Sequence, residues 1–179
     1  MKSLLCTLGL FLSLTIAACS TAPSTDADKA DIRAEAERAL ATAQRNDSSL
    51  TPMIKAAKGY AVFPTVGKGA IGVGGAYGKG VLYEDGVFAG YCDLSQVSIG
   101  FQLGGQAYTE IIAFENADAV NLFKSGNFAF GAQATAVALK SGAGGNAKYS
   151  SGVAVFTMGE SGLMYEASVG GQKFSFQGK

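Results

Sequence analysis

Residues 81–88 read Val81-Leu82-Tyr83-Glu84-Asp85-Gly86-Val87-Phe88, which is the pattern of a β-hairpin. Apolar and aromatic residues lie on both sides of the Glu-Asp-Gly segment, and Asp-Gly is a preferred pair for the tight turn between two antiparallel strands. This stretch therefore predicts antiparallel β-structure in the middle of the chain.

Strands with alternating side-chain size are expected on both sides of this hairpin. Large residues occupy the odd positions 71, 73 and 77, and again 97, 99, 101 and 103, with small or polar residues between them. Since a strand points successive side chains to opposite faces, each of these strands has one apolar face and one nearly bare face. Further strands are predicted at residues 108–114, 128–139, 153–157, 163–169 and 173–176, and a loop at residues 141–146.

Glycine makes up 25 of the 179 residues and lines the bare faces of these strands. Glycine weakens a strand by about 0.5–1 kcal/mol relative to alanine, so something should approach the backbone closely there. We expect that neighbour to be an alanine-rich helix; an acyl chain or another ligand is the alternative.

Residues 26–58 are rich in charge and predict two helices. The first runs from about Asp28 to Arg45, with acidic residues at its start and a basic residue at its end, as the helix dipole favours. One narrow stripe of this helix is apolar and alanine-rich: Ile32, Ala36, Ala39, Leu40 and Ala43. The second helix is expected to begin at Thr51-Pro52 and to end at Gly59, and a third to run from a cap at Asn116 through Phe123.

The predicted fold class is therefore α+β, with N-terminal helices packed on a Gly-rich, mainly antiparallel β-sheet or open barrel. A membrane-spanning β-barrel is the less favoured alternative. Such a barrel would need no acyl anchor, and the charged N-terminal helices would not be part of it.

The first eighteen residues predict a lipoprotein signal peptide. Lys2 precedes an uncharged run whose apolar centre, residues 4–16, is too short to span a bilayer as a helix. The run ends in Ile16-Ala17-Ala18-Cys19, which resembles the lipobox of bacterial lipoproteins, where the cysteine receives acyl chains. An ordinary secretory signal with an incidental cysteine is the alternative.

We therefore expect residues 1–18 to be removed, Cys19 to be lipidated, residues 19–27 to form a flexible tether and residues 28–179 to form a single domain. Ser20 follows the cysteine, and resemblance to the lipoprotein sorting rule then favours the outer membrane of the cell envelope, with the domain facing the periplasm or the surface.

Composition excludes several classes of function. The chain carries 14 basic and 14 acidic residues, which argues against a nucleic-acid-binding protein. It contains no histidine, which excludes a Ser–His triad and an imidazole metal site. We predict no cofactor, no metal site and no enzyme activity, since Glu110, Glu115 and Asp118 are explained by helix capping and solvation. Cys92 is expected to be a buried, inert residue.

Gly67-Lys68-Gly69-Ala70-Ile71-Gly72 matches the G-x-G-x-x-G pattern of dinucleotide sites. Such a site needs the glycine turn to open a helix, whose N-terminus then holds the pyrophosphate. The glycine-rich residues that follow cannot form a stable helix, so nucleotide binding is not expected.

Lysine and aromatic residues gather near the start of the β-rich region. Lys55, Lys58 and Lys68 surround Tyr60 and Phe63 in the sequence. Basic charge beside exposed aromatic side chains attracts anionic lipid headgroups, with about 1 kcal/mol per lysine near a membrane surface. These five residues form the predicted lipid-binding site; an ordinary solvated helix end accounts for the same spacing equally well.

The chain resembles the SYLF-domain family, the lipid-binding domain that also occurs in eukaryotic actin regulators. The segments that carry the resemblance are, in order, 57–64, 66–70, 78–81, 99–106, 126–134 and 142–145. The resemblance covers the chain from about residue 30 to the end, with departures at Glu110, where the family often has Asp, and at residues 68–70, where Lys-Ala-Gly is usual.

The resemblance implies a non-enzymatic domain that binds phospholipid, with phosphoinositides as ligands of eukaryotic members. Basic residues in and near the family's opening helix correspond by position to Lys55, Lys58 and Lys68. We expect a membrane-anchored lipoprotein whose partners are the phospholipid membrane and its own acyl chains, with anionic headgroups preferred. The alternative is a structural envelope lipoprotein or surface antigen that contacts a protein partner in the cell envelope.

Overall fold

The computed structural model describes residues 25–71, 73–99, 106–130, 136–139, 142–159, 169 and 171–179. The helices are α1 (Asp26–Asn46), α2 (Leu50–Ala56), α3 (Ala117–Lys124) and α4 (Ala143–Asn146). The strands are β1 (Gly59–Ile71), β2 (Val73–Glu84), β3 (Val87–Ile99), β4 (Gln106–Phe114), β5 (Val137–Ala138), β6 (Val153–Gly159) and β7 (Gln172–Gly178). Among the helices in these ranges, none combines the length and the hydropathy of a membrane span.

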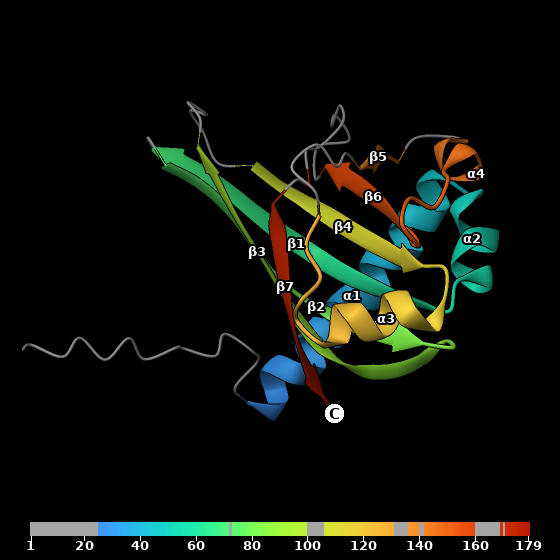
Figure 1. The fold of residues 1–179 in the computed structure, drawn as a ribbon, viewed down its shortest axis with the longest axis horizontal. Coiled ribbons are helices and arrows are strands. Elements are labelled where there is room, and N and C mark those ends of the chain that lie inside the picture. The colour runs from blue at the N-terminus through green and yellow to red at the C-terminus, as the bar shows by residue number, and fades with distance from the viewer. Residues whose placement is uncertain are drawn as a thin grey trace, which may run out of the picture.

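The strands form one seven-stranded sheet in the order β5-β6-β4-β1-β2-β3-β7 (Figure 1). The neighbouring strands are antiparallel, except for β5 and β6, which are parallel. The sheet is strongly twisted and its two edge strands do not pair with each other, so it remains open. The predicted α+β class, with helices on a mainly antiparallel open sheet, is confirmed.

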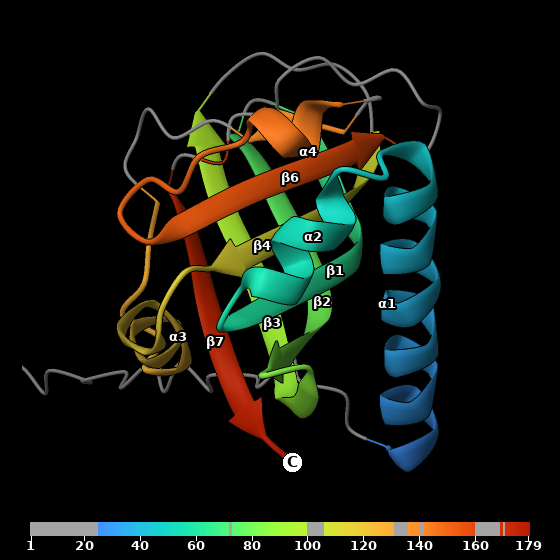
Figure 2. The ribbon, with the colours of Figure 1, turned by 90° about the vertical axis from the view of Figure 1, so that its right-hand side faces the viewer.

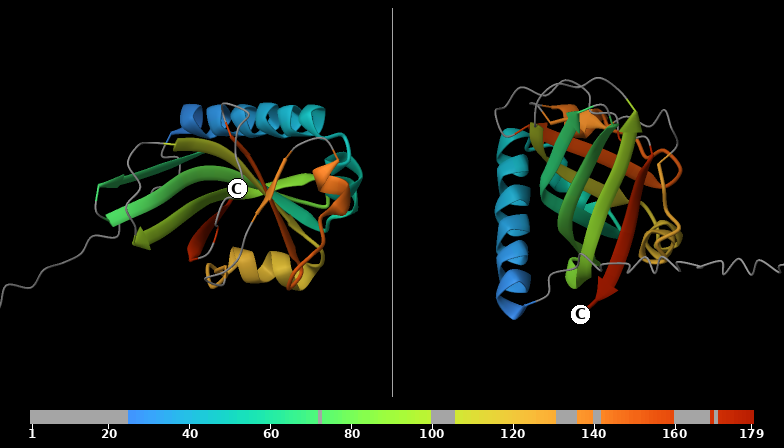
Figure 3. Two further views of the ribbon diagram at one scale, coloured as in Figure 1. Left: turned by 90° about the horizontal axis from the view of Figure 1, so that it is seen from above. Right: turned by 90° about the vertical axis from the view of Figure 1, so that its left-hand side faces the viewer.

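Helices cover the two faces of the sheet (Figure 3, left). We call the face under α1 the outer face: Ala36 and Ala43 of α1 are fully buried there against Val62, Val81 and neighbouring side chains. These small residues let the helix approach the sheet closely, as the alanine-rich stripe predicts.

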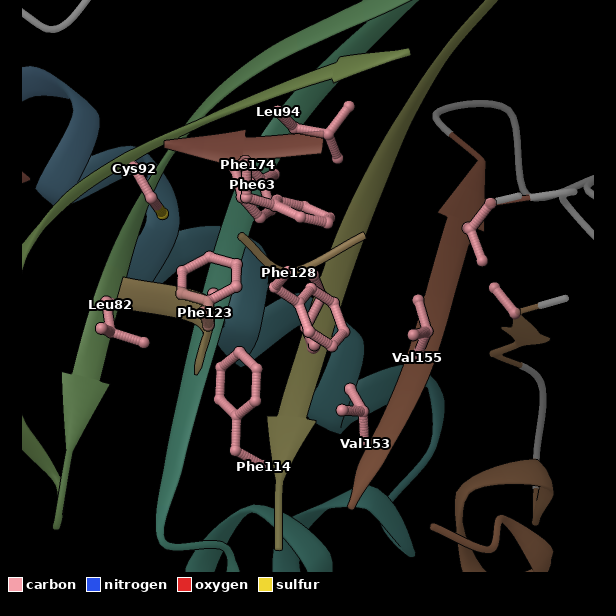
Figure 4. Packing of buried hydrophobic residues seen from close by; sticks show 14 of the residues in the cluster. Phe63, Leu82, Cys92, Leu94, Phe114, Phe123, Phe128, Val153, Val155 and Phe174 are labelled. Carbon is pink, nitrogen blue, oxygen red and sulfur yellow. The ribbon is translucent and has the colours of Figure 1, made fainter. Parts of the chain in front are cut away.

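The opposite, inner face holds an aromatic core that α3 covers (Figure 4). Phe174 of β7 lies at its centre, with ring centroids 5.1 Å from Phe123, 5.7 Å from Phe128 and 5.8 Å from Phe63. Burying each phenylalanine contributes about 1.5–3 kcal/mol to folding, so this cluster is the main apolar core.

A turn and a β-bulge of the sheet follow directly from the sequence. Asp85 and Gly86 have φ angles of 51° and 76°, so both central residues of the predicted hairpin turn adopt the positive φ that it requires. Pro64 lies in a bulge of β1, where the register with both neighbouring strands shifts. A proline has no N–H to donate, and its carbonyl accepts a hydrogen bond of 2.8 Å from the Thr109 hydroxyl.

Several predicted boundaries are wrong. Helix α1 begins at Asp26, inside the expected tether, because the Thr25 hydroxyl accepts a hydrogen bond from the Asp28 amide. Helix α2 begins one residue before Thr51. The expected strand 71–77 is not continuous, because Ile71 ends β1 and pairs with Val73 of β2, so the chain reverses between them.

The end of the chain also differs from expectation. In the predicted strand 128–139, residues 128–130 contribute one isolated bridge and only β5 is a strand, while residues 131–135 lie outside the described ranges. The expected loop at 141–146 contains the single helical turn α4. The predicted strand 163–169 lies outside the described residues except for Val169, and so do the signal peptide and Cys19.

Most glycines of the stretches 71–77 and 97–103, for which an alanine-rich helix was the expected neighbour, lie outside the described part of the structure, so that prediction stays open. Two other strand glycines have aromatic neighbours. A Cβ at Gly80 would lie 2.7 Å from the Phe63 ring, and a Cβ at Gly90 would lie 2.8 Å from the Phe176 ring. Both contacts are on the inner face, because residues 80 and 82 share a face and Leu82 belongs to the inner core. Aromatic rings from neighbouring strands, and not the alanine-rich helix on the outer face, fill the space that these glycines leave.

Candidate functional site

The structure does not bring the five predicted lipid-binding residues into one cluster. Lys55 is exposed on α2, Lys58 follows that helix, and Tyr60 and Phe63 lie in β1. Lys68 lies within β1, ten residues after Lys58, which immediately precedes that strand; at about 3.3 Å per residue the two are about 30 Å apart. The side chain of Lys68 is outside the described part of the structure. Lipid binding by these residues remains a prediction.

Lys58 pairs with the tip of the β2–β3 hairpin. Its Nζ lies 2.7 Å from Asp85 Oδ2 and 2.9 Å from Oδ1, and its carbonyl accepts a hydrogen bond from the Asp85 amide. The hydrogen bond and the charge of Asp85 raise the pKa of Lys58. The lysine charge is therefore already compensated, and a lipid phosphate would have to compete with Asp85 for it.

Tyr60 belongs to a ladder of aromatic rings on the outer face. It stacks on Tyr83 with centroids 4.9 Å apart, Tyr83 meets Phe88 edge to face, and Phe88 meets Tyr91 in the same way. The Arg33 guanidinium of α1 lies 4.3 Å above the Phe88 ring. Burial and the nearby charge of Glu37 raise the pKa of Tyr83 to about 12, so its hydroxyl is neutral at ordinary pH.

Phe63 is fully buried, contrary to the expectation of an exposed aromatic residue. Residues 60 and 63 are an odd number apart on one strand, so their side chains point to opposite faces. Tyr60 faces α1 and Phe63 joins the inner core, where its ring packs against Phe174. Phe63 therefore contributes to the fold and cannot meet a membrane surface together with Tyr60.

The structure brings together residues that the sequence pattern did not single out. The start of α1, the β2–β3 hairpin and the end of β7 lie at the same end of the molecule, which we call the tether end (Figures 2 and 3). The Tyr91 hydroxyl donates to the Lys29 carbonyl at 3.3 Å, which attaches α1 to β3 there. Val87 beside the hairpin turn is 62 % exposed. In the sequence, Lys29 and Arg33 are four residues apart, which places both on the same face of α1. This spacing was the sequence signal for a basic region at the start of the helix.

A buried polar cluster lies on the inner face. Glu110 of β4 is fully buried, although the sequence analysis assigned it to capping and solvation. Gln172 Nε2 donates to Glu110 Oε2 at 2.9 Å and to the Tyr108 hydroxyl at 3.4 Å. Burial and the Glu110 charge raise the pKa of Tyr108, so its phenol stays protonated. Strand alternation places residues 108 and 110 on the same face as Phe114, which is why Glu110 points inward.

Neither metal nor thiol chemistry has support in the described residues. Within those ranges no three His, Cys, Asp or Glu residues lie close enough to hold a metal ion. Cys92 is buried as predicted, and burial raises the pKa of its thiol, which keeps it in the unreactive protonated form. The G-x-G-x-x-G pattern runs along β1 and is followed by strand β2, so it lacks the helix that a nucleotide site requires.

The fold is that of a small α+β domain built on one open, mainly antiparallel sheet. Residues 95–179, from the end of β3 through β7, match the family described as Ysc84, Las17-binding protein actin regulator. This match covers just under half of the chain and confirms the resemblance to the SYLF family seen in the sequence. This is a family of lipid-binding and actin-regulator-related proteins.

A curated relative agrees with this assignment. Beta cell expansion factor A of Aeromonas veronii is 29 % identical over 84 residues, which are 47 % of this chain and 32 % of that protein. The chain thus spans about a third of the length of this relative.

Proposed function

We propose that this protein is a membrane-tethered lipoprotein whose SYLF domain binds phospholipid without catalysing a reaction and prefers anionic headgroups. In this proposal, acyl chains on Cys19 hold it at the outer membrane of a cell envelope, facing the periplasm or the surface. The family match across residues 95–179 supports lipid binding as the general activity. The lipobox-like residues 16–19 support the anchor.

The observation that carries the proposal is the small number of residues between Cys19 and the start of α1. Seven residue steps separate Cys19 from Asp26, so even a fully extended tether spans about 25 Å. An acylated Cys19 would therefore keep the tether end of the domain close to the bilayer surface. Val87, exposed at that end, is available to enter the headgroup region.

The headgroup preference rests on two basic residues, Arg33 of α1 and Lys55 of α2. Lys55 is exposed and has no ion-pair partner among the described residues, and Arg33 is held over the Phe88 ring at the tether end. Each such charge contributes about 1 kcal/mol near an anionic surface. Asp26 and Asp28 in the first turn of α1 oppose this attraction, so the expected preference is modest and decreases with added salt.

A second candidate function is contact with a protein partner, as in a structural envelope lipoprotein or surface antigen. The family description names a protein-binding regulator, which favours this alternative. The lipid experiments below separate the two functions.

Two measurements test the proposal. Mass spectrometry of the native protein should find acyl chains on residue 19, and the Cys19→Ser variant should lose them together with membrane association. Flotation of the chain from Ser20 onwards should recover more protein with vesicles of phosphatidylcholine and phosphatidylglycerol than with phosphatidylcholine alone. Arg33→Ala combined with Lys55→Ala should reduce flotation with the anionic vesicles, whereas Lys173→Ala, at the far end of β7, should not.

An unmodified thiol at residue 19 of the native protein would contradict the anchor. Equal recovery with both vesicle types would contradict the headgroup preference. No recovery with either type, together with a protein cross-linked to the domain in its envelope, would favour the second candidate.

A further inference from the structure

A cleft lies between α2 and α4, which are side by side at the right of Figure 1 and near the end of α1 in Figure 2. We call it the helix cleft. Its volume is about 410 Å³, and sites for small ligands occupy about 300–1,000 Å³. The 21 residues of α1, at about 1.5 Å each, place it about 30 Å from the tether end. The helix cleft is therefore distinct from the surface that faces the membrane in the proposed function.

Hydrogen bonds hold the two walls of the helix cleft together. The Gly144 amide donates to Asp47 Oδ2 at 2.6 Å, and the Gly145 amide donates to the Ser49 hydroxyl at 2.7 Å. These bonds attach α4 to the link between α1 and α2. The backbones approach so closely that a Cβ at Gly144 would lie 3.0 Å from the Leu50 amide nitrogen. The helix cleft is thus formed before a ligand enters, which reduces the entropic cost of binding.

One part of the helix cleft is apolar. Met53 of α2, Ala147 and Tyr149 line it, and all three are partly buried against the outer-face core. Pro52 adds an exposed apolar ring beside them. This part of the cleft can therefore accommodate a hydrocarbon group of a ligand.

The remaining lining carries one acidic and one basic side chain. Glu115 and Lys148 are both exposed, and neither forms an ion pair within the described ranges. Burial and the nearby charge of Glu115 raise the pKa of Tyr149, so a carboxylate and a neutral phenol lie close together. A carboxylate beside an aromatic ring attracts an organic ammonium group, and a lysine attracts an acid group.

The two opposite charges restrict the class of ligand. Glu115 would repel a molecule that carries only negative charge, and Lys148 would repel one that carries only positive charge. A ligand with both an ammonium and an acid group satisfies both side chains, and an apolar side chain on the same ligand would contact Met53 and Ala147. An aliphatic amino acid has these three groups.

We propose that the helix cleft binds a small apolar zwitterion, a free aliphatic amino acid or dipeptide. Glu115 and the Tyr149 ring contact its ammonium group, Lys148 contacts its carboxylate, and Met53 and Ala147 contact its side chain. This binding activity is additional to the proposed attachment to a membrane and does not depend on it.

The test uses the purified full-length protein in dodecyl maltoside, an uncharged detergent, with ligand-observed NMR as the readout. Saturable binding of L-leucine or leucyl-leucine is expected at millimolar concentration or below. N-acetyl-leucine lacks the ammonium group and leucinamide lacks the carboxylate, so each should bind at least about tenfold more weakly than leucine.

Variants assign the binding to the helix cleft. Glu115→Gln and Lys148→Gln should each weaken binding of the zwitterion about tenfold. Glu35→Gln on α1 and Lys55→Gln on α2 remove the same charges from exposed positions that do not line the cleft, so they should leave binding unchanged. Circular dichroism and the thermal midpoint establish that each variant is folded.

Absence of binding of both leucine and leucyl-leucine at about 10 mM would overturn the proposal, and so would variants of Glu115 and Lys148 that bind like the parent protein. Binding of phosphoethanolamine but of neither leucine compound would also overturn it, in favour of a lipid headgroup. Vesicle flotation of Glu115→Gln should match that of the parent protein, which separates failure of this site from failure of lipid binding.

Discussion

Asp47, the residue that ends α1, is almost fully buried and joins two distant segments of the chain. Its carboxylate accepts hydrogen bonds from the amide and hydroxyl of Ser49 and from the amides of Gly142 and Gly144. Burial alone would raise the pKa of Asp47, but these hydrogen bonds outweigh burial and lower it. The ionised form is therefore the one that the folded protein stabilises.

A depressed pKa makes stability depend on pH in a defined direction. The contribution of Asp47 is present above its unfolded pKa of about 3.9 and is lost as the pH falls through the lower pKa of the folded state. Asp47→Asn should lower the free energy of unfolding by about 1–3 kcal/mol at pH 7, and by less in acid. Urea unfolding of both proteins at pH 7 and pH 3 measures this; an equal difference at both pH values would contradict it.

Gly80 is constrained by its neighbours in the sheet. A Cβ there would lie 2.5 Å from the Val62 carbonyl oxygen and 2.7 Å from the Phe63 ring, and the backbone oxygen cannot move without breaking the strand pairing. Gly80→Ala should therefore lower the free energy of unfolding by about 1–3 kcal/mol. Gly67→Ala on the adjacent strand is the control, because its nearest neighbour would be 3.9 Å away. Equal stability of the two variants would show that Phe63 and β1 shift freely.

At the scale of the elements, local patterns predicted those features that depend on local chemistry. The Asp85-Gly86 turn has the expected positive φ angles. The Asn116 side chain accepts a hydrogen bond from the Ala119 amide and caps α3 as expected. Both features arise from residues within four positions of one another, so a short window of sequence contains their whole cause.

The errors occur where distant contacts decide the outcome. The alternation of residues 71–77 looks like one strand, although the pairing of Ile71 with Val73 reverses the chain there. For the candidate site, proximity in sequence suggested that Tyr60 and Phe63 act together, but the alternation of β1 separates them onto opposite faces. The contact of Arg33 with Phe88 joins α1 to β3, two elements whose contact no local sequence pattern predicted.

At the scale of the whole molecule, side chains connect strands that do not pair through their backbones. In the sheet order, β1, β2 and β3 separate β4 from β7. The sheet nevertheless curls enough for the Gln172 side chain of β7 to donate a hydrogen bond to Glu110 of β4. Both residues are fully buried. This hydrogen bond and the packing of the Phe174 ring against Phe63 hold β7 against the inner face.

Removing the amide of Gln172 should loosen this connection. Gln172→Leu keeps the volume but leaves the buried Glu110 carboxylate with one partner fewer, at an expected cost of about 1–3 kcal/mol in the free energy of unfolding. Gln177→Leu, an exposed position on the same strand, is the matched control and should change stability little. Chemical denaturation measures both; a Gln172→Leu protein as stable as the parent would show that the contact does not hold β7 in place.

The position of Phe174 also constrains when the domain acquires its native state during biosynthesis. Phe174 packs against Phe63, Phe123 and Phe128, yet it is translated after all three. A nascent polypeptide that has emerged only as far as Gly159 lacks both the aromatic ring and the strand that pairs with β3. The complete aromatic core and the pairing of β7 with β3 can therefore form only after the last strand has been synthesised.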